Sequence, residues 1–215
     1  MTQNYLDKKV EWRKLRLIDK FFYDKFTNSG NKMLDLGCGP GEYGPYLKKK
    51  CNYLVGIDYD IKLLDVAKKR EYDKLRHTLV RDKLEYEDYE FDNLWSSEFL
   101  EHLPNLKILD ELERITTYTM VITIPNPLSP HFKRDKTHIL KYSVRGLKKF
   151  LRKRKGWNYK VIGLGFDDIP GPDWLKKLTS YLLYYIPELS PTIAIIGERE
   201  LPNAYDIILG RFGLK

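Results

Sequence analysis

Short apolar runs alternate with helical segments along most of this 215-residue chain, and this alternation restricts the fold more than any other feature. Helices between successive strands act as right-handed crossovers, so the strands pair in a mostly parallel sheet that helices cover on both faces. We therefore expect an α/β protein. The expected strands are residues 33–36, 53–58, 77–80, 91–97, 118–125 and 158–165, and the expected helices lie near residues 6–26, 43–50, 60–71, 106–116, 143–154 and 173–186.

The C-terminal part holds two further strand-like runs, residues 192–198 and 205–212. Both are rich in branched apolar residues, and periodicity alone does not choose between them. One of the two is expected to close the sheet.

A glycine-rich loop follows the first expected strand, in the sequence LDLGCGPGEYG of residues 34–44. Its glycines allow positive φ angles and a close approach of the backbone to a ligand. Pro40 removes an N–H group from the loop, and Asp35 and Glu42 place a carboxylate on each side of it. A pyrophosphate would be repelled here, which disfavours a nicotinamide-dependent oxidoreductase. S-adenosylmethionine is a nucleoside without phosphate that carries an ammonium and a sulfonium group, and it fits this loop.

Three more motifs follow in order: GIDYD, LVRDKLEY and FDNLWSSEFLEHLPN. With LDLGCGPG they resemble the motifs of class I S-adenosylmethionine-dependent methyltransferases over about residues 30–165. The resemblance implies a Rossmann-like, seven-stranded, mostly parallel sheet in which Asp58 holds both ribose hydroxyls and Asp82, with Lys83 beside it, contacts the adenine amino group. The cofactor-binding residues that it implies are Asp35, Gly37, Cys38, Gly39, Gly41, Asp58, Tyr59, Asp82, Lys83 and Ser97.

The segment SEFLEHL carries three side chains that suit a metal or acid–base site. Glu98, Glu101 and His102 stand at i, i+3 and i+4, so on a helical turn they share one face. Two carboxylates and an imidazole suit Mg²⁺ or Mn²⁺ better than zinc. His138 follows in the loop after the fifth expected strand and is a further candidate.

This pattern is similar to that of the ubiquinone-pathway O-methyltransferases and the small-RNA 2′-O-methyltransferases. The resemblance implies that Glu98, Glu101, His102 and His138 are metal ligands that hold a diol-like acceptor. Two alternatives stay open: catalysis without metal, with His138 as general base and Glu98 as the second catalytic residue, and a purely structural role.

The acceptor is indicated only indirectly. The expected helix at 173–186 has an apolar face, which fits a lid packed on the sheet, an apolar acceptor pocket or a peripheral membrane contact. We expect O-methylation of a small-molecule or lipid-like acceptor. RNA methylation is one alternative, since the net charge is +8 and basic residues lie near His138. These basic residues are Lys133, Arg134, Lys136 and Lys141. A non-catalytic binding protein is another, because the cofactor motifs say nothing about methyl transfer.

We expect a single domain over residues 1–215, made of an N-terminal cap helix (1–30), a cofactor-binding core (31–165) and an acceptor-side helix with a closing strand (166–215). No apolar run is long enough to span a bilayer, and no signal peptide is evident. The only cysteines are Cys38 and Cys51, so we expect a reduced, cytoplasmic protein.

Overall fold

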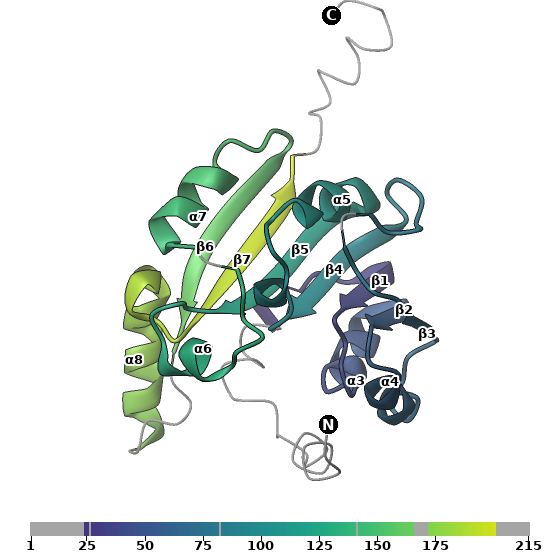
Figure 1. The fold of residues 1–215 in the computed structure, drawn as a ribbon, viewed down its shortest axis with the longest axis horizontal. Helices are drawn as coiled ribbons and strands as arrows, with labels where there is room; N and C mark the ends of the chain where they lie inside the picture. The colour runs from purple at the N-terminus through teal and green to yellow at the C-terminus, as the bar shows by residue number, and fades with distance from the viewer. Residues whose placement is uncertain (1–23, 26, 82, 141, 166–171, 201–215) are drawn as a thin grey trace, which may run out of the picture.

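The computed structural model describes residues 24–25, 27–81, 83–140, 142–165 and 172–200. Its strands form one seven-stranded sheet in the order β3-β2-β1-β4-β5-β7-β6 (Figure 1). The pairs from β3 to β5 are parallel, whereas β7 runs antiparallel to both β5 and β6. The predicted fold class is confirmed. The strands are β1 (Gly30–Leu36), β2 (Cys51–Asp58), β3 (Lys74–His77), β4 (Phe91–Ser97), β5 (Thr116–Pro125), β6 (Trp157–Leu164) and β7 (Thr192–Arg199).

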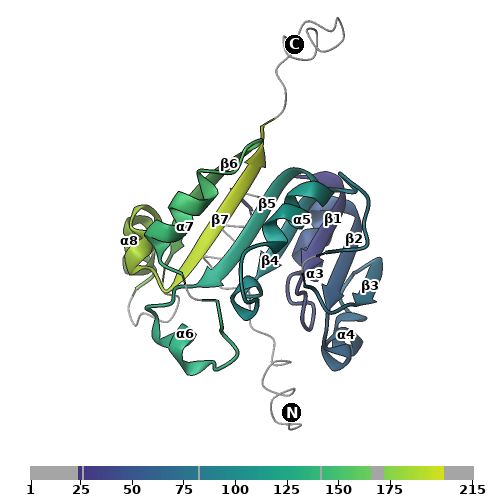
Figure 2. The same cartoon turned by 45° about the horizontal axis from the view of Figure 1, so that its top comes forward.

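Helices lie on both faces of this sheet (Figure 2). Side chains alternate along each strand, so β1 sends Leu34 and Leu36 into one apolar cluster and Met33 into the other. The first cluster is covered by α5 and α7, and the second contains Leu47 of α3 and packs against Tyr184 of α8. The described helices are α3 (Gly44–Leu47), α4 (Ile61–Ala67), α5 (Ile108–Ile115), α6 (Pro130–Arg134), α7 (Val144–Leu151) and α8 (Asp173–Tyr185), with 3₁₀ turns η1 (Lys48–Lys50), η2 (Leu100–His102) and η3 (Pro187–Leu189).

Side-chain caps fix where several helices begin. The side chain of Asp60 accepts a hydrogen bond from Lys62 N at 2.9 Å, and that of Ser143 accepts one from Gly146 N at 3.0 Å. Each cap satisfies a backbone donor that the helix itself leaves free. Caps of this kind place α4 and α7 immediately after their loops.

The third expected strand, residues 77–80, is wrong. The observed β3 is Lys74–His77, which pairs in parallel with Val55–Asp58. β3 lies at the edge of the sheet and its sequence KLRH has no apolar alternation, whereas the apolar Val80 is buried in the core beyond the strand. The buried apolar residue of the expected strand at 77–80 therefore packs in the core after the observed strand and does not belong to its hydrogen-bonded pairing with β2.

Of the two candidate C-terminal strands, residues 192–198 and 205–212, the structure describes only the first. Residues 192–198 form most of β7, inserted between β5 and β6. Residues 205–212 and most of the expected helix at 6–26 lie outside the described residues. In the described part of the chain, no helix is long and apolar enough to cross a bilayer.

Candidate functional site

The glycine loop lies where the strand order reverses, because β1 pairs with β2 on one side and with β4 on the other. Ligands of such sheets bind at the carboxyl ends of the strands at this point. The N–H groups of Gly37 and Cys38 both donate to Ile57 O at 2.9 Å, and Gly39 N donates to Asp58 Oδ2 at 2.8 Å. The loop is thus tied to the end of β2, and Asp58 is held beside it.

Asp58 is in a position that suits ribose hydroxyls. Its Oδ1 accepts from Asp60 N at 2.8 Å, so each carboxylate oxygen holds one backbone N–H. A carboxylate oxygen has two acceptor sites, so each oxygen can still accept one hydroxyl. Asp58 is 7% exposed.

Two glycines of the loop differ in what surrounds them. Gly37 and Gly39 both have positive φ angles, 72° and 51°. A Cβ atom on Gly37 would lie 2.5 Å from the Phe99 ring, whereas one on Gly39 would meet no atom within 4 Å. Gly37 is therefore required for packing, and Gly39 leaves open space beside the loop that a ligand can enter.

This difference gives a paired prediction. Gly37→Ala should lower the thermal stability strongly, because it adds a clash with Phe99 to the strain of a positive φ. Gly39→Ala should cost only about 1 kcal/mol of the free energy of unfolding, since it adds backbone strain alone. It should nevertheless weaken S-adenosylmethionine binding, because the new methyl group fills the open space. Thermal melts and calorimetric titration test both parts, and equal stability of the two variants would contradict the packing argument.

Asp35 is almost completely buried beneath the loop, at 1% exposure, and accepts a hydrogen bond from Tyr72 Oη at 2.5 Å. Burial raises the pKa of Asp35 from 3.8 to about 7, the Tyr72 hydrogen bond opposes this rise, and the charge of Asp58 adds to it. Two carboxylates near one loop create a negative potential that favours a cationic ligand. Tyr72 was not predicted as a site residue, and it follows α4 with no motif to mark it.

The remaining predicted cofactor residues have varied surroundings. Tyr59 is 56% exposed, and Ser97 Oγ lies 3.2 Å from Tyr43 Oη and 2.9 Å from Thr123 Oγ1. Tyr43 was also not predicted, although it directly follows the glycine loop. Cys38 is a buried free thiol whose pKa is raised, chiefly by burial, and Gly41 N donates to Cys38 O at 2.9 Å. Lys83 is exposed, and Asp82 lies outside the described residues.

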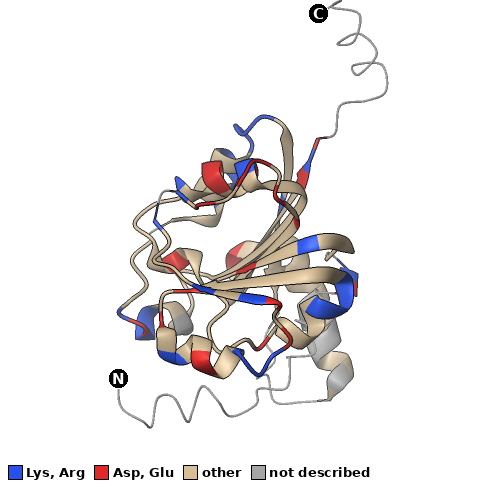
Figure 3. Ribbon diagram, turned by 90° about the vertical axis from the view of Figure 1, so that its right-hand side faces the viewer, with Lys and Arg blue, Asp and Glu red and all other residues tan. Residues whose placement is uncertain are grey.

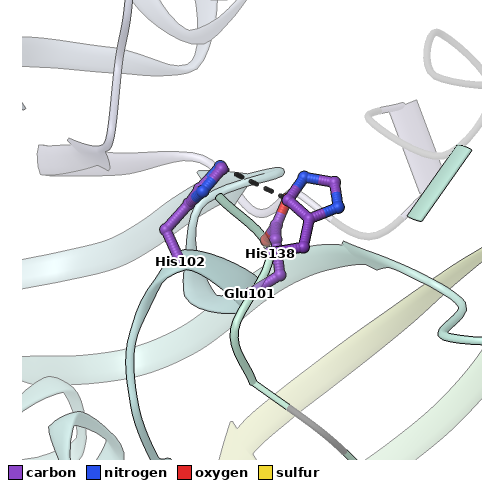
Figure 4. A group of neighbouring side chains, drawn as sticks. All are labelled: Glu101, His102 and His138. Atoms are coloured by element: carbon purple, nitrogen blue, oxygen red, sulfur yellow. Dashed lines mark ion pairs between the residues drawn. The ribbon is translucent and has the colours of Figure 1, made fainter. Parts of the chain in front are cut away.

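The second part of the site is a cluster of three side chains, Glu101, His102 and His138, hereafter the Glu101 cluster (Figure 4). Glu101 and His102 belong to η2, and His138 follows α6. The potential ligand atoms of all three lie within 4.8 Å of one another. Ile139 N and Leu140 N donate to Glu101 O at 2.9 and 3.0 Å, and these hydrogen bonds hold the His138 loop against η2.

Backbone carbonyl groups set the orientation of both imidazoles. His138 Nδ1 lies 3.2 Å from Phe132 O, and His102 Nδ1 lies 3.2 Å from Thr137 O. A carbonyl only accepts, so each Nδ1 is the ring nitrogen that donates, and each Nε2 is the ring nitrogen on the side of Glu101. The two Nε2 atoms lie 3.8 and 3.9 Å from Glu101 Oε1. The Nε2 atoms of the two imidazoles and one carboxylate oxygen of Glu101 therefore lie close together.

Glu101 itself is fully buried, at 0% exposure, and among the described residues neither of its carboxylate oxygens has a hydrogen-bond partner. The pKa of Glu101 is raised well above its usual range, first by burial and then by the charges of Glu98 and Asp135. A buried carboxylate without partners is costly. A bound cation or a donor group would satisfy it.

Glu98 does not share a helical face with Glu101 and His102, and that prediction is wrong. Glu98 has a positive φ of 52° and precedes η2, which is a 3₁₀ turn and not an α-helix. Its N–H donates to Thr123 O at 2.9 Å, which ties this bend to β5. Glu98 remains close enough to raise the pKa of Glu101, but it is not one of the three side chains whose ligand atoms converge.

The chain resembles known methyltransferases in sequence. The methyltransferase domain family matches residues 34–118. Methyltransferase GfsG of Streptomyces halstedii is 27% identical over 112 residues, and the ribosomal protein L11 methyltransferase of Thermotoga neapolitana is 30% identical over 99 residues. These alignments cover 46% and 45% of this chain, and 39% and 37% of the two relatives. The chain thus matches less than half the length of each curated relative.

Solved structures share the fold over nearly the whole chain. A S-adenosylmethionine-dependent methyltransferase from Archaeoglobus fulgidus superposes with a TM-score of 0.63 at 18% identity, covering 92% of this chain and 100% of that one. A Haloferax volcanii protein solved in complex with the Trm112 methyltransferase activator gives 0.67 at 18% identity, covering 92% and 95%. At these identities the likeness establishes the fold.

Proposed function

We propose that the chain, whose residues 34–118 match the methyltransferase domain family and whose fold is that of S-adenosylmethionine-dependent methyltransferases, moves the methyl group of this cofactor to an oxygen atom of a small-molecule or lipid-like acceptor. The observation that carries the proposal is the Glu101 cluster beside the glycine loop. Phe99 connects the two, because its ring packs on Gly37 and it stands immediately before η2. An acceptor held at the cluster would therefore lie next to the cofactor.

The cofactor is held by groups at the ends of three strands. Asp58 accepts the ribose hydroxyls, the backbone at Gly39 lies against the cofactor, and Asp35 favours its positive charge. Ser97 lies at the end of β4 near the methionine part. Asp82 and Lys83 stay predicted contacts of the adenine ring.

Methyl transfer is an in-line displacement in which the acceptor oxygen forms a bond to the methyl carbon while the carbon–sulfur bond breaks. The sulfur keeps the bonding electron pair, so the sulfonium becomes a neutral thioether. The hydroxyl proton of the acceptor must leave, and the nearby imidazole of His138, whose side chain is only 4% exposed, is the candidate that takes it. In the absence of a metal, His138 acts as the base, and Glu98 contributes negative charge close to Glu101.

The Glu101 cluster also fits a divalent cation. Glu101, His102 and His138 would hold it, and Glu98 stays a predicted further ligand. The fit rests on the unpartnered oxygens of Glu101 and on the two carbonyl groups that orient the imidazoles, as at metal sites generally. A cation there would lower the pKa of an acceptor hydroxyl and would hold that hydroxyl in place. Two imidazole nitrogens favour Mn²⁺ over Mg²⁺.

RNA is a second candidate acceptor. Lys133, Arg134 and Lys136 are exposed in the segment that leads to His138, which suits an anionic acceptor. Blue and red segments are interspersed along the described part of the ribbon in Figure 3, however, so basic residues are not gathered in one stretch in that view. If the protein shows no measurable RNA binding at low salt, RNA is eliminated as the acceptor.

Calorimetric titration with S-adenosylmethionine and its demethylated product, with and without Mn²⁺, tests the proposal. One site per chain for both ligands is expected, and Mn²⁺ should increase the binding of catechol-like or hydroxylated lipid acceptors. Methyl transfer is then followed with labelled cofactor. Cofactor binding without transfer to any oxygen acceptor would leave a non-catalytic binding protein, and absence of cofactor binding would refute the proposal.

A further inference from the structure

The outward side of α8 carries large apolar side chains where a surface helix normally carries polar ones. They stand at i, i+4, i+7, i+8 and i+11, so they lie along one side of the helix. A continuous face of this kind marks an interaction surface. The exposed fractions are 65% for Trp174, 48% for Leu178, 63% for Tyr181, 53% for Leu182 and 65% for Tyr185.

The opposite side of α8 already packs on the sheet. The carbonyl oxygen of Leu183 lies so close to β6 that a Cβ atom on Gly163 would overlap it. Tyr184 packs against the apolar cluster that contains Ile162 and Leu164 of β6. The exposed apolar face is therefore additional to the core contact of the helix and is not a core face left uncovered.

A basic helix lies beside this face. α7 and α8 pack on opposite faces of the sheet beside the edge strand β6 (Figure 1), and a groove at this edge is lined by Lys148 of α7, by Arg152 directly after it, and by Tyr184 and Tyr185 of α8. Lys148 forms an ion pair with Glu188 at 3.0 Å. Five other cations of α7 and the turn after it are exposed, and no ion pair is found for them within the described ranges. They are Arg145, Lys149, Arg152, Lys153 and Lys155.

We propose that α8 and α7 together dock the protein on an anionic bilayer surface. Trp, Tyr and Leu side chains enter the boundary between headgroups and acyl chains, and neighbouring Lys and Arg bind anionic headgroups. The free cations of α7 and the net charge of +8 provide the charge complementarity. An apolar protein partner would not require these cations.

The position of α8 in the fold determines which edge of the sheet faces the bilayer when the protein docks. β6 is parallel to β5, because both are antiparallel to β7, and α8 follows the carboxyl end of β6. The glycine loop and the Glu101 cluster lie at the carboxyl ends of the other strands. Docking through α8 thus brings this edge of the sheet towards the bilayer, which suits a lipid-like acceptor. That last step rests on the proposed function, whereas the docking does not.

Co-sedimentation of the full chain with vesicles tests the proposal without cofactor or acceptor. Vesicles of phosphatidylcholine alone are compared with vesicles containing about one third phosphatidylglycerol. The wild type should bind the anionic vesicles, and added salt should weaken the binding. Trp174→Ala/Tyr181→Ala and, separately, Lys149→Gln/Arg152→Gln should each reduce the partition coefficient about tenfold. Tyr118→Ala, a 45% exposed tyrosine at the start of β5, should bind like the wild type.

Tryptophan fluorescence gives a direct readout of the apolar contact. Anionic vesicles should shift the wild-type emission to the blue, and Trp174→Phe should lose this shift. Unchanged S-adenosylmethionine binding and circular dichroism show that the variants fold.

Three results would overturn the proposal. They are equal binding to both kinds of vesicle, wild-type binding by Trp174→Ala/Tyr181→Ala, and a wild-type dimer in solution that these substitutions make monomeric, because a second copy would then occupy the face. Failure of methyl transfer with intact vesicle binding would refute only the proposed function.

Discussion

Glu101→Gln should abolish tight Mn²⁺ binding and leave S-adenosylmethionine binding unchanged. The amide keeps the size of the carboxyl group but removes the negative charge that lies beside the Nε2 atoms of His102 and His138. Loss of a charged ligand should weaken the metal about 100-fold or more, and methyl transfer should fall in parallel. Titration of Mn²⁺ into the metal-free protein measures the first effect, and labelled-methyl transfer measures the second.

The free energy of unfolding of Glu101→Gln distinguishes a metal-binding role of Glu101 from a structural role. The raised pKa of Glu101 means that burial disfavours its charged form, so the metal-free variant should be at least as stable as the wild type. Glu113→Gln is the matched control, because Glu113 accepts from Arg154 and from Tyr159 Oη at 2.6 Å and has no part in the cluster. It should lower stability and leave Mn²⁺ binding intact. Marked destabilisation by Glu101→Gln would instead assign Glu101 a purely structural role.

Asp35→Asn should raise the stability of the cofactor-free protein at pH 8 and weaken cofactor binding. The pKa of Asp35 rises from 3.8 to about 7 on folding, so the folded state holds its proton more tightly than the unfolded state. Stability from this group is fully present below the unfolded value and is lost as the pH rises through about 7. The shift corresponds to up to roughly 4 kcal/mol of the free energy of unfolding. The variant should lack this pH slope in thermal melts between about pH 5 and 8.

Asp35→Asn should weaken cofactor binding, although it raises the stability of the cofactor-free protein. The charged form of Asp35 favours a cationic ligand, so S-adenosylmethionine should bind with release of a proton near pH 6 to 7 in the wild type, and Asp35→Asn should bind it about ten- to a hundredfold more weakly. Calorimetry in buffers of different ionisation enthalpy detects the proton.

Asp73→Asn is the control, because the pKa of Asp73 is shifted in the direction opposite to that of Asp35. The pKa of Asp73 is lowered, although burial opposes this, because Lys48 and Leu54 N bind its carboxylate. This substitution should lower stability at neutral pH and keep the slope due to Asp35. A slope that persists in Asp35→Asn would show that another group carries it.

The alternation of apolar runs and the motif at residues 34–41 were sufficient to predict the fold class and the position of the glycine loop after the first strand. Both depend on local sequence: strand burial requires apolar runs, and the loop needs glycine at positive φ. The third strand was misplaced because the apolar residues near it serve the core beyond its end. The bend at Glu98 was missed because its positive φ is imposed by a hydrogen bond to Thr123, a residue of another strand.

By itself, the sequence determined which residue types are available and in what order: a glycine loop, acidic residues at strand ends and the pair Glu101–His102. Only the tertiary structure decided that His138 lies against them, since 35 residues of chain separate it from His102 and two backbone hydrogen bonds to Glu101 O hold its loop in place. The same holds for Tyr72 beneath Asp35 and for the outward side of α8. Contacts between distant segments depend on packing and chain path, which local periodicity does not encode.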